Sequence, residues 1–148
     1  MTNNVVNLQL RPKIRIVPQS ENVEAMLGKA LPLLKASILR NHRNVSLEDV
    51  CEDIIGGSSL LWAVYMDDTL IAAFTTCVMR HQKRKTLYIE YLGGVDMKIW
   101  IHAALNVLKD VATRAGLAAI EADGRIGFAR HAKNFGFEET YRHFEMEI

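Results

Sequence analysis

The sequence predicts a single α/β (α+β) domain with a mixed central sheet, antiparallel in its N-terminal half, and helices on both faces. The chain has 148 residues, 49% apolar and 24% charged, which is enough to build a core without metals or disulfides. Apolar residues repeat at helical spacing in some stretches and alternate in others. After residue 96, helical and strand-like stretches alternate, as they do where helices connect parallel strands.

A strand and a helix are expected first. Residues 13–17 are rich in β-formers and end at Pro18, and Ser20 then stands where a helix cap is expected. Apolar residues follow at spacings of three and four, which predicts a helix with one buried stripe. Because the ring of Pro32 would clash with the carbonyl of Gly28, we expect a kinked or divided helix rather than one straight rod.

A short helix and an antiparallel meander are expected next. The stretch Ser46-Leu-Glu-Asp49 fits the capping-box pattern, and Gly56-Gly57 ends the helix that follows. Three β-rich stretches come after it, separated by a tight turn and a basic loop. In chain order these strands and connections are 60–66, 67–69, 70–79, 80–85 and 86–92.

The last part of the chain alternates helices with strands. Asp96 can cap a long amphipathic helix that Gly116 closes. A strand (117–122), a turn (Asp123-Gly124), a helix (126–134) and a final strand (137–148) follow. In the final strand, apolar Phe144, Met146 and Ile148 alternate with polar residues, so one face should be solvated. Such a strand could also pair with a copy of itself in a homodimer.

Charge and cysteine content exclude several classes. The 18 basic and 17 acidic side chains give a net charge of +1, which argues against a nucleic-acid partner. Cys51 and Cys77 form no CxxC pair, so we expect no metal site and a reducing, cytoplasmic setting. No apolar run is long enough for a membrane helix. Residues 1–12 are interpreted as a flexible arm before a domain at 13–148.

The element order, the hairpin at 61–74 (LWAVYMDDTLIAAF) and the phrase AxxxGFEE at 132–139 together resemble the GNAT superfamily. The resemblance runs from about Lys13 to Ile148. It implies a GNAT-like domain that transfers an acyl group from coenzyme A, most simply from acetyl-CoA, to an amine. Motif-poor versions of this fold also resemble proteins encoded by bacteriophages.

Two positions depart from the pattern of the family. The Gly-rich loop that would receive the coenzyme pyrophosphate at a helix N-terminus is reduced here to residues 93–96. A tight turn with an N-cap is the alternative interpretation of that stretch. Ala132 stands where the family commonly carries a tyrosine acid. His131 is expected to be a surface or interface residue rather than a replacement, because a helix turns it about 100° away.

Glu90 is the first candidate for a catalytic base. An attacking amine must lose a proton, and a carboxylate in a partly desolvated cleft is suited to accept it. Alternation over 86–92 places Glu90 on one face with Tyr88 and Leu92. The alternative is a structural pair of Glu90 with an arginine or with the Tyr88 hydroxyl. Glu121, near the end of the next strand, is the second candidate.

The expected coenzyme contacts come from the resemblance and from charge. Backbone groups at Leu92 and Gly93 would meet the pantetheine arm. Cations around the fourth helix could meet the 3′-phosphate or form a solvated helix face. The full set of coenzyme candidates is Leu92, Gly93, Gly94, Lys98, Arg125, Arg130 and Lys133.

Two functions therefore stay open at this stage. One is an N-acyltransferase acting on a small-molecule or protein amine. The other is a catalytically silent GNAT-like binding or structural protein, to which the shortened loop and Ala132 point. The retained element order and the carboxylate at Glu90 favour the enzyme.

Overall fold

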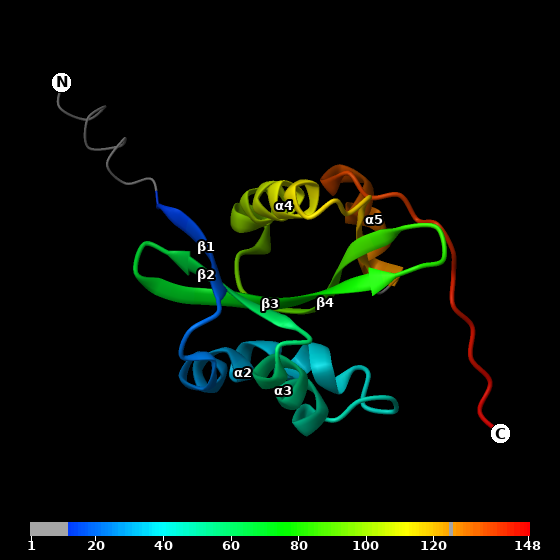
Figure 1. Cartoon of the computed structure of the whole chain (residues 1–148), viewed down its shortest axis with the longest axis horizontal. Helices are drawn as coiled ribbons and strands as arrows, with labels where there is room; N and C mark the ends of the chain where they lie inside the picture. Colours follow the sequence, from blue (N-terminus) through cyan, green and yellow to red (C-terminus); the bar gives the residue numbers. More distant parts are fainter. Residues whose placement is uncertain (1–11, 125) are drawn as a thin grey trace.

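The computed structural model describes residues 12–124 and 126–148 and shows three layers (Figure 1). A five-stranded sheet is covered by α2 and α3 on one face and by α4 and α5 on the other. The strands are β1 (Ile14–Gln19), β2 (Leu60–Met66), β3 (Thr69–Arg80), β4 (Lys85–Gly94) and β5 (Ile120–Ala122). The helices are α2 (Val23–Leu39), α3 (Leu47–Gly56), α4 (Met97–Arg114), α5 (Ile126–Ala132) and the 3₁₀ turn η1 (Lys133–Phe135).

The strands lie in the order β1-β2-β3-β4-β5, so each strand pairs with the next one along the chain. The first three pairings are antiparallel, and β4 pairs with β5 in parallel. The parallel step is possible because α4 carries the chain back across one face of the sheet. The predicted α/β class and mixed sheet are therefore confirmed.

The region around Pro18 and Pro32 differs from the sequence expectation. Pro18 lies inside β1 rather than ending it, which an edge strand tolerates because its outer N–H groups have no partner. The helix begins after Asn22 and not after Ser20. It then runs unbroken through Pro32, so the expected division is wrong. Burial of the stripe Leu27, Ala30, Leu34 and Ile38 against the sheet offsets the lost hydrogen bond.

The start of α3 confirms the predicted capping box. Ser46 Oγ accepts a hydrogen bond from the Asp49 amide at 3.1 Å, and the Asp49 carboxylate accepts one from the Ser46 amide at 3.0 Å. The hydrogen bond from the Ser46 backbone, and then one from the Ser46 side chain, lower the pKa of the Asp49 carboxyl. Gly57 closes the helix at φ 86, a left-handed conformation that glycine adopts without strain.

Two apolar clusters occupy the two faces of the sheet. On the α4 face, Phe74 stacks between Trp62 and Trp100, with ring centroids 5.7 and 6.3 Å away. The indole N–H of Trp62 donates to Thr76 Oγ1 at 2.9 Å, so its buried polar atom is satisfied. On the other face, α2 and α3 bury their apolar stripes against Leu61 and Ala73.

The start of α4 corrects one further expectation. Asp96 occupies the N-cap position, but its side chain makes no cap hydrogen bond and its backbone lies at φ 57. Two other hydrogen bonds hold the turn before α4 instead. The amide of Val95 donates to Ile71 O at 3.0 Å, and the Trp100 indole donates to Val95 O at 2.9 Å. Gly116 closes the far end at φ 72, as predicted.

The predicted final strand over 137–148 is wrong, because this stretch has no regular secondary structure. The amide of Phe137 still donates to Ala132 O at 3.0 Å. Glu138–Ile148, which we call the C-terminal arm, then leaves the body of the molecule (Figure 1). The alternating pattern is present, but a strand also needs a neighbouring strand, and the arm has none within the described chain. The strand expected at 117–122 is likewise shortened to β5.

Other expectations concern membranes, metals and the N-terminus. Within the described residues, no helix is long and apolar enough to span a membrane, and no group of His, Cys, Asp or Glu could hold a metal ion. Cys51 and Cys77 are both free thiols. Residues 1–11 of the expected N-terminal arm lie outside the described residues, so the division into 1–12 and 13–148 stays a prediction.

Candidate active site

The sheet opens between β4 and β5. The two strands pair only from Leu87–Ile120 to Ile89–Ala122, after which the chain leaves β5 through Asp123. The remainder of β4, residues 90–94, has no partner strand on this side among the described residues. A parallel pair that separates in this way leaves backbone N–H and C=O groups of one strand available to a ligand.

A β-bulge lies at the same point of β4. Thr76 of β3 faces Ile89 and Phe74 faces Leu92, so β4 carries one extra residue in this interval. The bulge reverses the expected alternation, because Leu92 packs with Ile89 in the α4-side cluster while Tyr91 packs in the α2–α3 cluster. The expectation that Glu90 shares a face with Leu92 is therefore wrong.

Glu90 is the first residue of the unpaired half of β4, and it faces the α2–α3 layer. Its Oε1 accepts a hydrogen bond from Ser59 Oγ, a residue just after α3, at 2.7 Å. The structural partner is thus Ser59 and not an arginine or Tyr88. Burial, followed by the charge and hydrogen bond of Glu90, raises the pKa of the Cys77 thiol to about 11. This thiol is therefore neutral near pH 7 and is a poor nucleophile.

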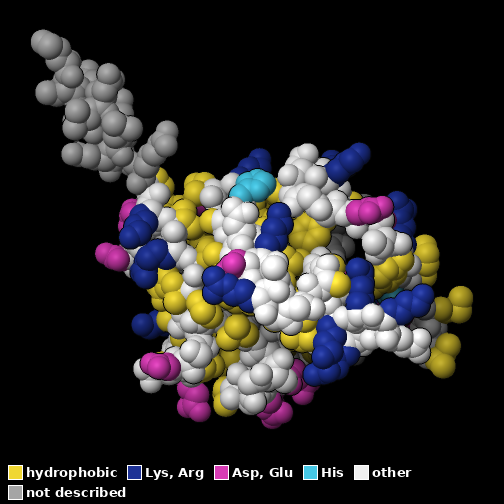
Figure 2. All heavy atoms as spheres, turned by 45° about the horizontal axis from the view of Figure 1, so that its top comes forward, with side chains coloured by type: hydrophobic (Ala, Val, Ile, Leu, Met, Phe, Trp, Pro, Cys, Tyr) yellow, Lys and Arg dark blue, Asp and Glu magenta, His cyan; other side chains and the backbone are white. Residues whose placement is uncertain are grey.

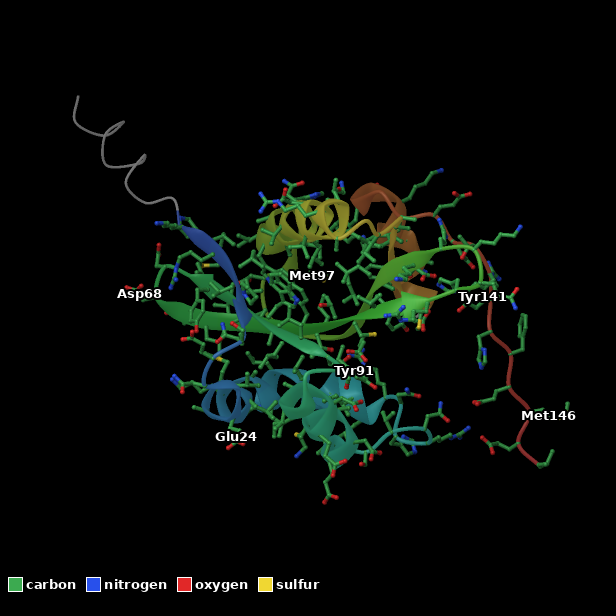
Figure 3. The ribbon with its side chains drawn as sticks, in the orientation of Figure 1. Glu24, Asp68, Tyr91, Met97, Tyr141 and Met146 are labelled. Carbon is green, nitrogen blue, oxygen red and sulfur yellow. The ribbon has the colours of Figure 1, made fainter. Side chains whose placement is uncertain are left out.

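The bulge also directs two backbone N–H groups out of the strand ladder. The amide of Tyr91 donates to Thr75 Oγ1 at 3.3 Å, and the amide of Leu92 donates to Ser37 Oγ of α2 at 3.4 Å. Figure 3 shows Tyr91 in the space between the sheet and the α2–α3 layer. Hydrogen bonds of this length to hydroxyl oxygens are weak, so a stronger acceptor could replace the hydroxyls.

Further carboxylates surround Tyr91. Burial raises the pKa of its hydroxyl first, and the charges of Glu90, Asp53 and Asp49 raise it further. Asp49 and Asp53 lie one turn apart on α3, so the helix turns both toward the same side. This side of the opening is therefore negative, which suits a cationic group. Sequence analysis named Asp49 only as part of a capping box and did not identify Ser59 or Asp53, because no local pattern connects α3 with a strand some forty residues later.

The two glycines that end β4 have structural reasons for being there. A Cβ on Gly93 would lie 1.9 Å from the carbonyl oxygen of Leu33, in α2. Gly94 adopts φ +135, and a Cβ there would lie 2.4 Å from Ala72. Both residues permit close backbone approach, so their presence alone does not indicate a coenzyme site.

The start of α4, which follows the end of β4, carries charges of both signs. Lys98 is exposed in the first turn, next to the exposed carboxylate of Asp96. The first-turn amides of a helix lack partners inside that helix and attract anions. The crevice behind this turn, between β4 and α4, is lined by Leu92, Ile89 and Trp100 and is too narrow for a water molecule.

Glu121 lies apart from Glu90. Its Oε2 is 2.6 Å from His81 Nε2 and also accepts a hydrogen bond from the Thr86 hydroxyl. Hydrogen bonds from Thr86 and then His81 lower the pKa of Glu121. The Glu121 carboxylate is therefore held by side chains from the β3–β4 connection and from the start of β4, and Thr86 lies about 13 Å of strand before Glu90.

Tyr88 precedes Glu90 by two residues on β4 and lies opposite Glu121 in the pairing of β4 with β5. Its hydroxyl donates to the carboxylate of Asp123, the residue that follows β5. Burial, and then the hydrogen bond to Asp123, raises the pKa of Tyr88 well above its usual range. The hydroxyl therefore stays protonated at physiological pH and donates a hydrogen bond to Asp123.

The structure describes two of the three cations around the fourth helix that were expected to meet the coenzyme 3′-phosphate. Arg130 of α5 and Lys133 of η1 are exposed, whereas Arg125 lies outside the described residues. Figure 2 shows Lys and Arg side chains scattered over the face that carries α4 and α5, with apolar side chains between them. His131 is exposed, as expected of a surface residue, and Ala132 is half-buried.

Comparisons with known proteins bear on the fold of the chain. No protein-family model and no curated protein matches the chain, but solved structures do. An aminoglycoside acetyltransferase from an uncultured soil metagenomic sample, in complex with sisomicin, has a TM-score of 0.67 at 15% identity, covering 91% of this chain and 96% of its own.

Two further structures show the same likeness. A predicted acetyltransferase from Clostridium acetobutylicum with acetyl-CoA has a TM-score of 0.63 at 10% identity, over 91% of this chain and 96% of its own. Glucosamine-6-phosphate N-acetyltransferase from Arabidopsis thaliana has a TM-score of 0.63 at 11% identity, over 91% and 98%. The chain therefore has the same fold as these acetyltransferases, in agreement with the GNAT-like fold that the sequence predicted.

Proposed function

We propose that this protein is an N-acyltransferase that transfers an acyl group from coenzyme A, with acetyl-CoA as donor, to a primary amine. One observation carries the proposal. The parallel pairing of β4 and β5 ends at Ile89, and the next residue, Glu90, brings a carboxylate to the start of the opening. A donor bound along the free strand would thus meet a base at the same point.

The residues around the opening fit an elongated donor with amide groups and phosphates. Among the described residues, no strand pairs with residues 90–94 on the β5 side, so the backbone groups there other than the amides of Tyr91 and Leu92 can bind amides of the donor. The first turn of α4, with Lys98, is suited to phosphate, and Arg130 and Lys133 supply further exposed cations. The short turn at Val95-Asp96 leaves fewer amides for phosphate than a long Gly-rich loop would.

In the proposed reaction the amine nitrogen attacks the thioester carbonyl carbon and the C–S bond breaks. The proton released by the amine passes to Glu90, directly or through a water, while Ser59 holds the carboxylate in place. The amides of Tyr91 and Leu92, turned out of the ladder by the bulge, can stabilise charge on the carbonyl oxygen. The departing thiolate takes a proton from solvent, because Ala132 offers no acid.

The acceptor is proposed to be a cationic amine of a small molecule or of a protein. Glu90, Asp53 and Asp49 make the α2–α3 side of the opening acidic. Such a site attracts an ammonium group, and Glu90 can then deprotonate it. An aminoglycoside acetyltransferase is among the proteins with a similar fold. A cytoplasmic location and a bacteriophage origin stay predictions.

The experiment combines coenzyme binding with turnover. Acetyl-CoA should raise the melting temperature of the wild-type protein in a concentration-dependent way, because a ligand that binds only the folded state stabilises it. Glu90→Gln should keep this shift and lower thiol release with an amine panel by roughly 10²–10⁴-fold, the usual contribution of a general base. Glu24→Gln, at an exposed position near the start of α2, is the matched control.

The outcomes separate the alternatives. If millimolar coenzyme causes no shift in the melting temperature, the acyltransferase function is wrong. A shift with turnover unchanged in Glu90→Gln removes Glu90 as the base. The same measurement on Glu121→Gln then tests the second candidate, whose carboxylate is held by His81 and Thr86.

A further inference from the structure

Helix α2 crosses the end of β4 closely enough to bring one of its side chains to the bulge. Among the strands, α2 packs most extensively on β4 (Figure 1), and a Cβ on Gly93 would lie 1.9 Å from Leu33 O. Ser37 follows Leu33 by about one turn, so both residues lie on the same side of the helix. The Ser37 side chain therefore reaches Leu92, the residue before Gly93.

The Ser37 hydroxyl and the Leu92 amide form a weak polar pair. The amide donates to Ser37 Oγ, with 3.4 Å between the two atoms, which is long for a hydrogen bond. The Ser37 side chain makes no other hydrogen bond within the part of the chain that the structure describes, so its own proton has no acceptor there. Both residues are only half-buried, so a ligand can reach the pair. Ser37 thus carries a donor that the fold does not use.

Two donors at this separation can bind the same oxygen atom. A hydroxyl donates over about 2.7–2.8 Å and an amide over about 2.9–3.0 Å. Two atoms that are 3.4 Å apart can both lie at such distances from a third atom. The hydroxyl proton rotates about the C–O bond, so it can turn toward that oxygen. An oxygen bound there would exchange one long hydrogen bond for two shorter ones.

The position of Glu90 places the proposed base on the same side of the sheet. Its carboxylate is held by Ser59, just after α3, and the Leu92 amide is directed to Ser37 in α2. Both groups therefore face the α2–α3 layer, and Glu90 and Leu92 are two residues apart along β4. A thioester whose carbonyl oxygen lies at Ser37 would have the base beside the face that an amine attacks.

We propose that Ser37 is a further catalytic residue, which donates a hydrogen bond to the thioester carbonyl oxygen together with the Leu92 amide. This inference rests on the proposed acyltransferase function. As the amine nitrogen bonds to the carbonyl carbon, an electron pair of the C=O bond moves onto the oxygen. The pair returns when the C–S bond breaks and the thiolate leaves. A donor aimed at this oxygen binds the charged intermediate more tightly than the uncharged thioester.

Kinetics of matched variants test the role of the hydroxyl. Ser37→Ala removes the donor, and alanine is well suited to a helix. We expect kcat to fall by roughly 10²–10³-fold, the usual cost of one lost donor to such an oxygen. The KM for acetyl-CoA should change little, because the interaction strengthens only as charge develops. Ser37→Thr keeps the hydroxyl and should restore most of the rate.

Ser20→Ala is the matched control, because Ser20 is an exposed serine just before α2. It should have the kinetics of the wild-type protein. Circular dichroism verifies that Ser37→Ala, Ser37→Thr and Ser20→Ala are folded.

Infrared spectroscopy of the bound donor gives a readout that does not depend on turnover. Acetyl-CoA labelled with a heavy isotope at the carbonyl carbon makes the thioester band visible against the protein. Binding to the wild-type protein should shift this band to lower frequency, because hydrogen bonds weaken the C=O bond. Ser37→Ala should still bind acetyl-CoA and should show a smaller shift.

The outcomes separate this inference from the function on which it rests. If the wild-type protein neither binds nor turns over acetyl-CoA, both are wrong. If it does, and Ser37→Ala has the same kcat and the same carbonyl band, the role of Ser37 alone is wrong. A rate that is lost in Ser37→Ala with the carbonyl band unchanged, and is not restored in Ser37→Thr, would show a packing role and would also overturn the inference.

Discussion

Gly93 shows how one residue fixes the distance between two layers. The end of β4 crosses the backbone of α2 so closely that a Cβ on Gly93 would lie 1.9 Å from Leu33 O and 2.8 Å from its carbonyl carbon. Backbone atoms in the middle of a helix cannot move aside as a flexible side chain can. A glycine here therefore keeps α2 against the sheet next to the bulge.

We predict that Gly93→Ala lowers the free energy of unfolding by about 2 kcal/mol or more, since overpacking usually costs ~1–3 kcal/mol. Gly28→Ala is the control in the same layer. A Cβ at Gly28 meets nothing within 4 Å, so the variant should gain roughly 0.5–1 kcal/mol from helix propensity. Urea unfolding of the three proteins measures both. Equal stability of Gly93→Ala and wild type would contradict the close contact.

At the scale of elements, α3 depends on its first turn. The helix has 10 residues and buries only Val50 and Ile54, so it has little packing to hold it. Isolated helices of this length are marginal in water. The reciprocal bonds between Ser46 and Asp49 therefore matter more here than at the start of a longer helix.

We predict that Ser46→Ala lowers the free energy of unfolding by about 1 kcal/mol, the usual value of a lost N-cap. Ser46→Asp retains an acceptor for the Asp49 amide and should recover most of it. If α3 also positions Asp53 and Ser59 beside Glu90, the alanine variant should raise the KM for amines. Thermal unfolding and steady-state kinetics check the two effects, and an unchanged melting temperature would contradict the role of the cap.

At the scale of the whole molecule, the two apolar clusters share one sheet. Trp62 and Phe74 point to the α4 face, while the adjacent Leu61 and Ala73 point to the α2–α3 face. Loosening either helix layer therefore exposes the strands that support the other one. Both layers should unfold as one unit.

We predict coincident urea transitions by tryptophan fluorescence and by far-ultraviolet circular dichroism at a fixed protein concentration. Trp62 and Trp100 both lie in the α4-side cluster, so fluorescence reports that layer. The circular dichroism signal includes α2 and α3 as well. An earlier transition in circular dichroism would mean that the α2–α3 layer unfolds first and that the sheet does not couple the layers.

Much of the architecture could be predicted because it is written in local patterns. The capping box before α3, the stripe of α4, the hairpin at 61–74 and the order of the elements each depend on residues close together in the chain. Glu90 could be selected in the same way, as a carboxylate in an apolar strand. Even the alternation in the C-terminal arm is a correct property of the sequence.

The tertiary structure decided what depends on neighbours distant in the chain. The bulge that turns Leu92 to the opposite face arises between two strands, and the pairing of Glu90 with Ser59 spans 31 residues. The arm has the pattern of a strand, but a strand exists only where a second backbone supplies its hydrogen bonds. Sequence periodicity determines which face of an element is apolar; packing determines what that face meets.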